Sequence, residues 1–408
     1  MTRLAIPTKL IVALLALFGL LIVSACTGTP SSGSGTGTGK GDAGSTQEGP
    51  APSSTQAPVQ TAVTMNPPDG ATGVNPTTPL QVTANDGTMM SVSVANNDGV
   101  EVQGSLSADA KTWTSSEPLG YSRTYTATVK TLSDKGITSQ YTGAVQTVVP
   151  EKQTAVTSIP GKPGNTYGVG MPLIVKFDEP IKDKDKAEEF MVVTTSVPTM
   201  GAWYWFSDKE AHWRPKDYYQ PGTTVNLDMK IYGQDLGGGM YGQKDHSTSF
   251  TVGDSMVSEI SNADKQLKVY KNGELIRTMP ASLGMAKYPS QSGIHVVQEK
   301  YEMKIMDSST WGLPTDAPDG YYEEVPYATR ISFSGEFVHA APWSVADQGV
   351  RNVSHGCINL SMENGKWFHD TATYGDIVVI TGTEVDLKAT DGWGDWNIPW
   401  ETWQAGNK

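Results

Sequence analysis

The residues with the clearest chemical potential are one cysteine and two histidines in the last quarter of the chain. His339 precedes Cys357 by eighteen residues, and the segment around the cysteine reads Ser354-His355-Gly356-Cys357-Ile358-Asn359. A cysteine attacks carbonyl carbons as a thiolate, so it needs an imidazole to take the proton and backbone N–H groups to hold the oxyanion. The segment therefore has the make-up of a thiol nucleophile with its base, and Gly356 would let the backbone approach a substrate closely.

The other cysteine, Cys26, lies at the end of a predicted secretion signal. Arg3 and Lys9 supply positive charge, residues 10–23 form an apolar run, and Val23-Ser24-Ala25-Cys26 resembles the bacterial lipobox. We predict that residues 1–26 are a lipoprotein signal peptide and that Cys26 is lipidated. The chain would then be exported and anchored to the outer face of the cytoplasmic membrane. The alternative is a small-residue cleavage site with an incidental cysteine.

Export leaves Cys357 without a partner for an internal disulfide, because the sequence has two cysteines and the anchor accounts for the first. A lone cysteine in an oxidising compartment is either reactive or buried and inert, and the flanking histidines favour a reactive one. A zinc site built from Cys357, His355 and His339 would lack the paired spacing of common zinc ligands. We therefore expect no metal and no cofactor.

The net charge of −13 excludes a nucleic-acid partner, since a phosphate-binding surface needs an excess of basic residues. At 408 residues the chain is long enough for two or three domains after its leader. Residues 27–60 are rich in Ser, Gly, Thr and Pro and cannot bury a core, so they are predicted to form a flexible tether.

Residues 61–149 and 150–252 are predicted to be two tandem immunoglobulin-like β-sandwich domains. Both contain short alternating segments separated by turn residues, and at an offset of one hundred Trp113 aligns with Trp213 and Thr124 with Thr224. The aromatic residues of the second module could form a ligand platform, although core or inter-domain packing is favoured. These residues are Tyr204, Trp205, Trp213, Tyr218 and Tyr219.

Residues 253–383 are predicted to form a mostly β domain that presents the thiol and its base. Asn272-Gly273 indicates a tight hairpin turn, and residues 362–371 are the one helical segment expected there. His339 falls at a predicted strand end and Cys357 on the loop after it, so a rigid sheet would hold both. Residues 384–408 form a tail that is expected to pack back on the protein, because Trp393, Trp396, Trp400 and Trp403 are unlikely to stay in water.

The pattern of His339 followed by Ser354-His355-Gly356-Cys357-Ile358-Asn359 resembles the signature of the L,D-transpeptidases, which have a YkuD-type catalytic domain. The resemblance extends over nearly the whole chain and is strongest to the mycobacterial-type members. It includes Gly335-Glu336-Phe337-Val338-His339, the hairpin, the lipobox, the two β modules and the tail Gly394-Asp395-Trp396-Asn397-Ile398-Pro399-Trp400.

This resemblance implies that Cys357 attacks the diaminopimelate carbonyl of a peptidoglycan tetrapeptide stem and releases D-alanine. The resulting thioester is transferred to an amine of a second stem. His339 would be the base, held through the backbone carbonyl of Ala340, which stands where the family often has serine. His355 would shape the pocket rather than act as the base.

The resemblance also implies the remaining site residues. The N–H groups of Cys357 and Gly356 would bind the oxyanion with help from the hydroxyl of Tyr321. A lid and two substrate channels would be lined by Met306, Trp311, Tyr321 and Trp343, and Ser354 and Asn359 complete the predicted substrate-binding set. Trp311 stands where a tyrosine is common, so no hydroxyl contact is carried over to it.

Three functions remain to be compared at this point. The leading one is a peptidoglycan L,D-transpeptidase that is acylated by carbapenem-type β-lactams, works as a monomer and is held to a membrane by its lipid anchor. An L,D-carboxypeptidase or cysteine peptidase on the same stems would use water as the acceptor, although papain-like enzymes place the cysteine before the histidine. A wall-binding lipoprotein with a decayed site is disfavoured because His339, His355 and Cys357 are all present.

Overall fold

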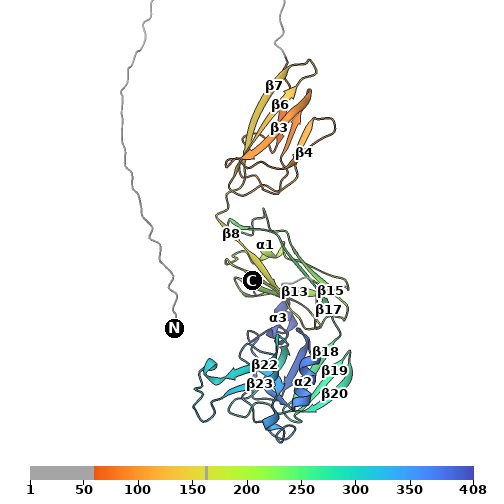
Figure 1. Cartoon of the computed structure of the whole chain (residues 1–408), viewed down its shortest axis with the longest axis vertical. Coiled ribbons are helices and arrows are strands. Elements are labelled where there is room, and N and C mark those ends of the chain that lie inside the picture. Colours follow the sequence, from red (N-terminus) through yellow and green to blue (C-terminus); the bar gives the residue numbers. More distant parts are fainter. Residues whose placement is uncertain (1–58, 161–163) are drawn as a thin grey trace, which may run out of the picture. The chain divides into compact units, whose positions relative to one another are not determined.

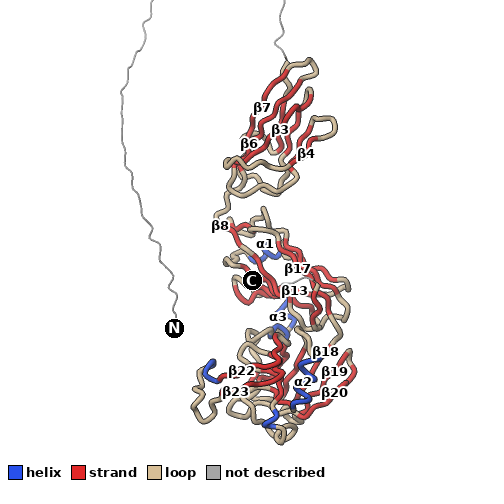
Figure 2. The backbone as a smooth tube through the Cα atoms, viewed as in Figure 1, coloured by secondary structure: helices blue, strands red, loops and turns tan. Residues whose placement is uncertain are grey.

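The computed structural model describes residues 59–160 and 164–408. The predicted signal peptide, Cys26 and nearly all of the predicted tether lie outside these residues. The described chain is mostly β, as the sequence predicts, with strands running from β1 to β27 (Figures 1 and 2). Within it, no helix is both long and apolar enough to cross a membrane.

Two sheets build the first module, with strand orders β1-β2-β5-β4 and β3-β6-β7. Strict alternation along β6 directs every second side chain inward, onto a core that includes Leu80, Val82 and Trp113. The strands are β1 Val63–Asn66, β2 Gln81–Ala84, β3 Thr88–Asn96, β4 Gly104–Leu106, β5 Thr112–Ser115, β6 Thr124–Leu132 and β7 Thr138–Gln146.

The second module has two four-stranded sheets, β13-β14-β11-β9 and β10-β17-β15-β12, and a short β16-β8 pair. Its core contains Leu173, Trp205 and Phe250. The elements are β8 Lys152–Thr154, β9 Val156–Ile159, β10 Asn165–Tyr167, β11 Leu173–Phe177, α1 Lys184–Glu188, β12 Val192–Thr195, β13 Gly201–Ser207, β14 Glu210–Pro215, β15 Thr224–Met229, β16 Met240–Gly242 and β17 His246–Val252.

Equivalent tryptophans support the tandem reading of these modules. Trp113 on β5 and Trp213 on β14 are both buried, and each covers a glycine on the neighbouring strand. A Cβ atom added to Gly104 would lie 2.1 Å from the Trp113 ring, and one added to Gly201 would lie 2.0 Å from the Trp213 ring. The same Trp-on-Gly packing therefore occurs at the aligned positions of both modules.

Residues from β18 onward form a six-stranded sheet, β20-β19-β18-β26-β21-β27, and a four-stranded sheet, β22-β23-β24-β25. The predicted hairpin is present between β19 and β20, where Asn272 and Gly273 both have positive φ. The strands are β18 Met256–Ser261, β19 Gln266–Lys271, β20 Glu274–Pro280, β21 Gln291–Val296, β22 Glu299–Asp307, β23 Tyr322–Arg330, β24 Phe337–Ala340, β25 Ile358–Leu360, β26 Ile377–Thr381 and β27 Val385–Asp386.

The predicted helix is α2, Met362–Thr371, and it begins where Ser361 accepts a hydrogen bond from the Asn364 N–H. It packs directly on β24, because a Cβ atom on Gly365 would lie 2.6 Å from the Ala340 nitrogen. Gly365 thus allows the helix to approach the strand that carries His339. The short 3-10 helices are η1 Ser308–Trp311, η2 Pro342–Ser344 and η3 Gly394–Asn397.

The C-terminal tail, with η3 and the short helix α3 Trp400–Gln404, packs back on the second module as predicted. The Trp403 indole donates to the Ala202 carbonyl at 2.8 Å, and its ring stacks on Tyr204 with centroids 5.0 Å apart. Tyr218 contacts Trp396 edge to face. Packing therefore accounts for these aromatic residues, rather than a ligand platform.

Candidate active site

Strand register brings the predicted nucleophile and base to one face of the four-stranded sheet. Strands β24 and β25 are parallel, and His339 is paired with Asn359. Cys357 lies two residues before Asn359, directly ahead of β25, so side-chain alternation directs both residues to the side that His339 faces. The eighteen-residue separation in sequence thus becomes proximity across two neighbouring strands.

Cys357 is buried and protonated in the resting site. Its side chain is 9% exposed, and its sulfur lies 3.8 Å from the Gly335 carbonyl oxygen. Burial raises the pKa of the Cys357 thiol to about 12. A thiolate at this position therefore has to be formed by proton transfer to a neighbouring base when the substrate is bound.

His339 has the properties of that base. Its Nδ1 lies 2.9 Å from the Ala340 carbonyl oxygen, and because a carbonyl can only accept, Nδ1 carries the proton. This leaves the lone pair on Nε2. Burial lowers the pKa of His339 to about 4, against the opposing effect of the Ala340 carbonyl. The ring is therefore neutral near pH 7, and the carbonyl contact implied by the family resemblance is present.

The turn before Cys357 is organised by Ser354. The Ser354 hydroxyl donates to the Cys357 carbonyl at 2.6 Å and accepts from the Gly356 N–H at 3.2 Å. Gly356 has φ +121°, a conformation that L side chains rarely adopt. In this structure the Gly356 N–H is directed to Ser354, because the tight turn brings that hydroxyl within reach, and the oxyanion role of this N–H stays a prediction.

Two pockets meet at Cys357, and both are lined by Met306, Tyr321, His355 and the cysteine itself. The first has a cavity volume of about 160 Å³ and adds His339, Trp343, Ser354 and Asn359. The second is larger, about 710 Å³, and adds Trp311 and Gly356. All ten predicted catalytic and substrate-binding residues in this domain therefore lie on one of the two pockets.

His355 is held as part of the pocket wall by aromatic neighbours. Its ring lies 4.8 Å from that of Tyr288 and 4.9 Å from that of Tyr321. Desolvation lowers the pKa of His355, and its buried Nε2 has no hydrogen-bond partner. The Trp311 indole donates to the Tyr321 hydroxyl at 3.1 Å, so this tryptophan contacts the predicted oxyanion group through its N–H.

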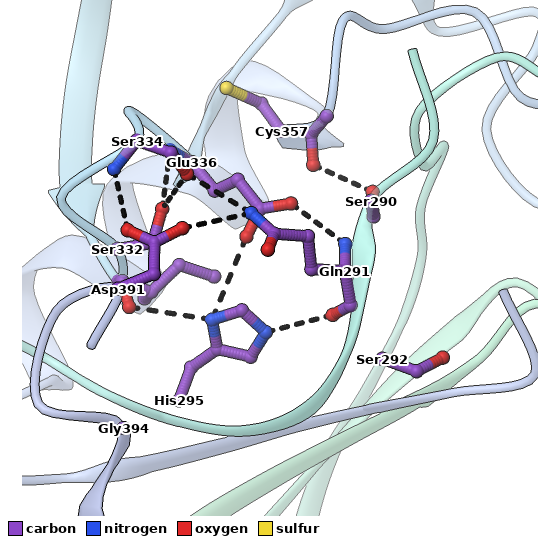
Figure 3. A network of polar contacts seen from close by, with 12 residues as sticks. Ser290, Gln291, Ser292, His295, Ser332, Ser334, Glu336, Cys357, Asp391 and Gly394 are labelled. Atoms are coloured by element: carbon purple, nitrogen blue, oxygen red, sulfur yellow. Dashed lines mark hydrogen bonds and ion pairs between the residues drawn. The ribbon is translucent and has the colours of Figure 1, made fainter. Parts of the chain in front are cut away.

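Two residues behind the cysteine, Glu336 and Ser290, were not predicted as site residues from the sequence. Glu336 is 5% exposed, lines the second pocket and accepts a hydrogen bond from the Gln291 N–H at 2.8 Å (Figure 3). Burial raises the pKa of its carboxyl to about 8. Ser290 is fully buried beside it and donates to the Gly356 carbonyl. Glu336 lies within the Gly335–His339 motif, but no sequence signal marks Ser290.

No group of three His, Cys, Asp or Glu side chains within residues 59–160 and 164–408 is arranged to hold a metal ion. A buried thiol, a neutral imidazole with a free Nε2 and two pockets that meet at the sulfur define an enzyme with a cysteine nucleophile. The comparisons with known proteins identify the family to which this enzyme belongs.

Residues 255–380 match the model of the L,D-transpeptidase catalytic domain, and residues 71–235 match a bacterial Ig domain. The chain is 44% identical over 341 residues to L,D-transpeptidase 2 of Mycobacterium tuberculosis strain CDC 1551 / Oshkosh, covering 83% of each chain. It is 38% identical over 350 residues to L,D-transpeptidase 5 of strain H37Rv, covering 84% of this chain and 76% of the relative.

A solved structure of an L,D-transpeptidase in complex with imipenem is also similar, with 35% identity and a TM-score of 0.50. The match covers 57% of this chain and all of that one. The chain belongs to the L,D-transpeptidase family, and it is an enzyme of this class.

Proposed function

We propose that this enzyme cross-links peptidoglycan by transferring an acyl group from one stem peptide to another through a thioester on Cys357. The observation that carries the proposal is the meeting of two pockets at a single buried thiol. Transfer needs room for a donor and an acceptor on opposite sides of the same carbonyl carbon, whereas hydrolysis needs room for only one peptide and a water molecule.

In the first half-reaction the Cys357 thiol gives its proton to Nε2 of His339 while sulfur attacks the diaminopimelate carbonyl of a tetrapeptide stem. The carbonyl π electrons move to oxygen, and the Cys357 N–H and the Tyr321 hydroxyl are the donors that stabilise the oxyanion. Collapse of the tetrahedral intermediate breaks the C–N bond to D-alanine. The His339 imidazolium protonates the departing amine.

In the second half-reaction the side-chain amine of diaminopimelate on another stem attacks the thioester. Neutral His339 takes the proton from the attacking nitrogen, the C–S bond breaks, and the imidazolium returns the proton to sulfur. The low pKa of His339 favours the proton-returning step of each half-reaction, because its imidazolium gives up the proton readily. Neither step requires a metal or a cofactor.

A carbapenem should acylate the same sulfur, since its strained lactam carbonyl requires the same nucleophile and oxyanion donors. The similarity to an L,D-transpeptidase in complex with imipenem supports this part of the proposal. Opening of the lactam forms the S–C bond and breaks the C–N bond within one molecule, so the whole inhibitor stays attached to Cys357.

We further propose that the enzyme is exported as a monomer and lipid-anchored through Cys26, on the outer face of the cytoplasmic membrane. The support is the sequence of residues 1–26, with its basic start, apolar run and Val23-Ser24-Ala25-Cys26. Radiolabelled palmitate should be incorporated into the wild-type chain and not into Cys26→Ser. Equal incorporation into both would contradict the anchor assignment.

The reaction is tested by incubating the full-length protein with a disaccharide-tetrapeptide and following the products by mass spectrometry. Dimers that have lost one D-alanine are expected, and Cys357→Ala should abolish them. Tripeptide monomers alone would indicate hydrolysis instead of transfer. Dimers formed at the wild-type rate by Cys357→Ala would show that the nucleophile is assigned wrongly.

A further inference from the structure

Ser290 is a fully buried serine directly behind the catalytic turn, one residue before β21. Its hydroxyl donates to the Gly356 carbonyl at 2.6 Å and accepts from the Gly284 N–H at 2.9 Å. A hydroxyl has one proton, and here that proton is committed to Gly356 while a lone pair is committed to Gly284. The direction of the Ser290 O–H bond is therefore fixed.

The Gly356 carbonyl and the Cys357 N–H belong to the same peptide unit. In a planar trans peptide the C=O and N–H bonds point in opposite directions. A hydroxyl that holds the carbonyl toward the protein interior therefore aims the N–H away from it, toward the side where the sulfur lines both pockets. In Figure 3 Ser290 lies to one side of Cys357, and the Cys357 sulfur points away from it. The Ser290 hydroxyl is bonded to the carbonyl oxygen of the preceding residue, Gly356.

We propose that Ser290 is a positioning residue for this acyl transfer, which orients the Gly356–Cys357 peptide so that its N–H can bind the oxyanion. This inference rests on the thioester mechanism proposed above. It adds a residue that does not itself reach the substrate and that acts through the peptide unit next to the nucleophile.

Few other backbone N–H groups in this turn are available to bind an oxyanion in place of the Cys357 N–H. The neighbouring donor, the Gly356 N–H, is already bonded to the Ser354 hydroxyl. Because Gly356 has no Cβ and a positive φ, the Gly356–Cys357 peptide could rotate more easily than one that follows an ordinary residue. A fixed hydrogen bond to its carbonyl is what such a flexible peptide needs in order to keep one orientation.

The surroundings hold Ser290 itself in place. Glu336 accepts from the N–H of the next residue, Gln291, and a Cβ atom on Gly356 would lie 3.6 Å from the Glu336 side chain. On the other side, a Cβ atom on Gly284 would lie 2.5 Å from the Ser290 nitrogen, so the loop from residue 284 to 290 is folded tightly on itself. The donor hydroxyl therefore sits on a rigid support, which an orienting group requires.

The test separates oxyanion stabilisation from thiol reactivity. Acylation of Cys357 by imipenem builds negative charge on a carbonyl oxygen, whereas alkylation by iodoacetamide displaces iodide and builds none there. Both reactions need a folded site and the same sulfur. The two rates, measured by intact-protein mass spectrometry on the full-length chain, should respond differently to loss of the Ser290 hydroxyl.

Ser290→Ala should slow imipenem acylation roughly 10- to 100-fold, somewhat less than the loss of an oxyanion donor outright, and leave alkylation within about threefold of wild type. Ser290→Thr, which keeps the hydroxyl, should recover most of the acylation rate. The matched control is Ser292→Ala, two residues along, where the hydroxyl is bonded to Thr383 instead. It should leave both rates unchanged.

Wild-type acylation in Ser290→Ala would overturn the proposal. An equal fall in both rates would also overturn it, because that result describes a general disturbance of the site. Failure of the underlying mechanism would look different: wild type would not be acylated at all, or the adduct would still form in Cys357→Ala.

Discussion

Two buried histidines of this protein differ in charge, because one ring is neutral near pH 7 and the other is a cation. His339 in the pocket is 3% exposed and His212, under the C-terminal tail, is 4% exposed. The pKa of His339 is lowered to about 4, whereas that of His212 is raised to about 9. Burial alone therefore does not decide the protonation state; the partners of each ring do.

Burial lowers the pKa of both rings, and only His212 has charged partners that outweigh this effect. Its Nδ1 lies 2.6 Å from an Asp395 oxygen and its Nε2 lies 2.9 Å from a Glu210 oxygen. Each ring nitrogen therefore faces a carboxylate, and the two carboxylates stabilise the protonated ring. His339 has a single neutral carbonyl on Nδ1. One ring is thus fixed as a cation that joins the tail to β14, and the other is kept neutral so that Nε2 can take and return a proton.

The largest effect on activity is expected from replacing His339, whose ring is neutral. His339→Gln should lower the rate of dimer formation by roughly 10²- to 10⁴-fold, the usual contribution of a general base, because the side chain can no longer take the thiol proton. His212→Gln is the matched control and should keep the rate within about threefold at 25 °C. If both variants lost activity equally, the two histidines would not have the separate roles described here.

His212, whose ring is charged, should contribute to the stability of the fold rather than to activity. Asp395→Ala leaves a buried imidazolium with one carboxylate, and breaking a buried pair in this way costs about 3–5 kcal/mol. We expect a corresponding decrease in the free energy of unfolding, measured by urea titration with tryptophan fluorescence. Alkylation of Cys357 by iodoacetamide below the unfolding transition should be unaffected. A loss below about 1 kcal/mol would contradict the assignment of His212 as a charged clamp.

The stability contributed by His212 should depend on pH. Because the folded-state pKa is about 9 and the ordinary value is 6.5, its contribution is fully present below pH 6.5 and is lost as the pH rises through 9. The difference in unfolding free energy between wild type and His212→Gln should therefore shrink by about 3 kcal/mol between pH 6.5 and 9. A difference that grew over this range would show that the folded ring is neutral.

A smaller effect is expected from the cation next to His212. The Arg214 guanidinium lies 4.5 Å from the Trp403 ring and 4.8 Å from the Trp396 ring, and it donates to the Ile398 carbonyl. Arg214→Lys keeps the charge but loses the planar group, so we expect a loss of about 1–2 kcal/mol in thermal or urea unfolding. An unchanged midpoint would mean that charge alone holds the tail.

Those features of the fold and the site that have a local sequence pattern could be predicted from the sequence. The hairpin follows from Asn272-Gly273, helix α2 from the possible start signals Ser361 and Asn364, and the nucleophile from the segment around Cys357. The pairing of His212 with Asp395 spans 183 residues and has no local pattern, so only the packed tail reveals it.

The hydrogen bonds inside the site could not be predicted from the sequence for the same reason, because they have no local sequence pattern. Serines are common in loops, and nothing in the order Tyr288-Pro289-Ser290-Gln291 says that this hydroxyl will reach Gly356 from 66 positions away. The oxyanion role implied for the Gly356 N–H depended on a free donor, and the bond to Ser354 became visible only with the geometry of the turn. Chemistry-bearing residue types are readable from sequence, but the orientation of the peptides between them is not.

The central claim is that His339, neutral because it is buried, is the base for Cys357, rather than the nearer His355. It is tested most directly by the pH dependence of imipenem acylation under limiting inhibitor, in wild type and in His355→Gln. We predict one acid limb near pH 4 in both proteins, because the pKa of His339 is about 4 and His355 is not the group that accepts the thiol proton. An acid limb that is present in wild type and disappears in His355→Gln would contradict this prediction.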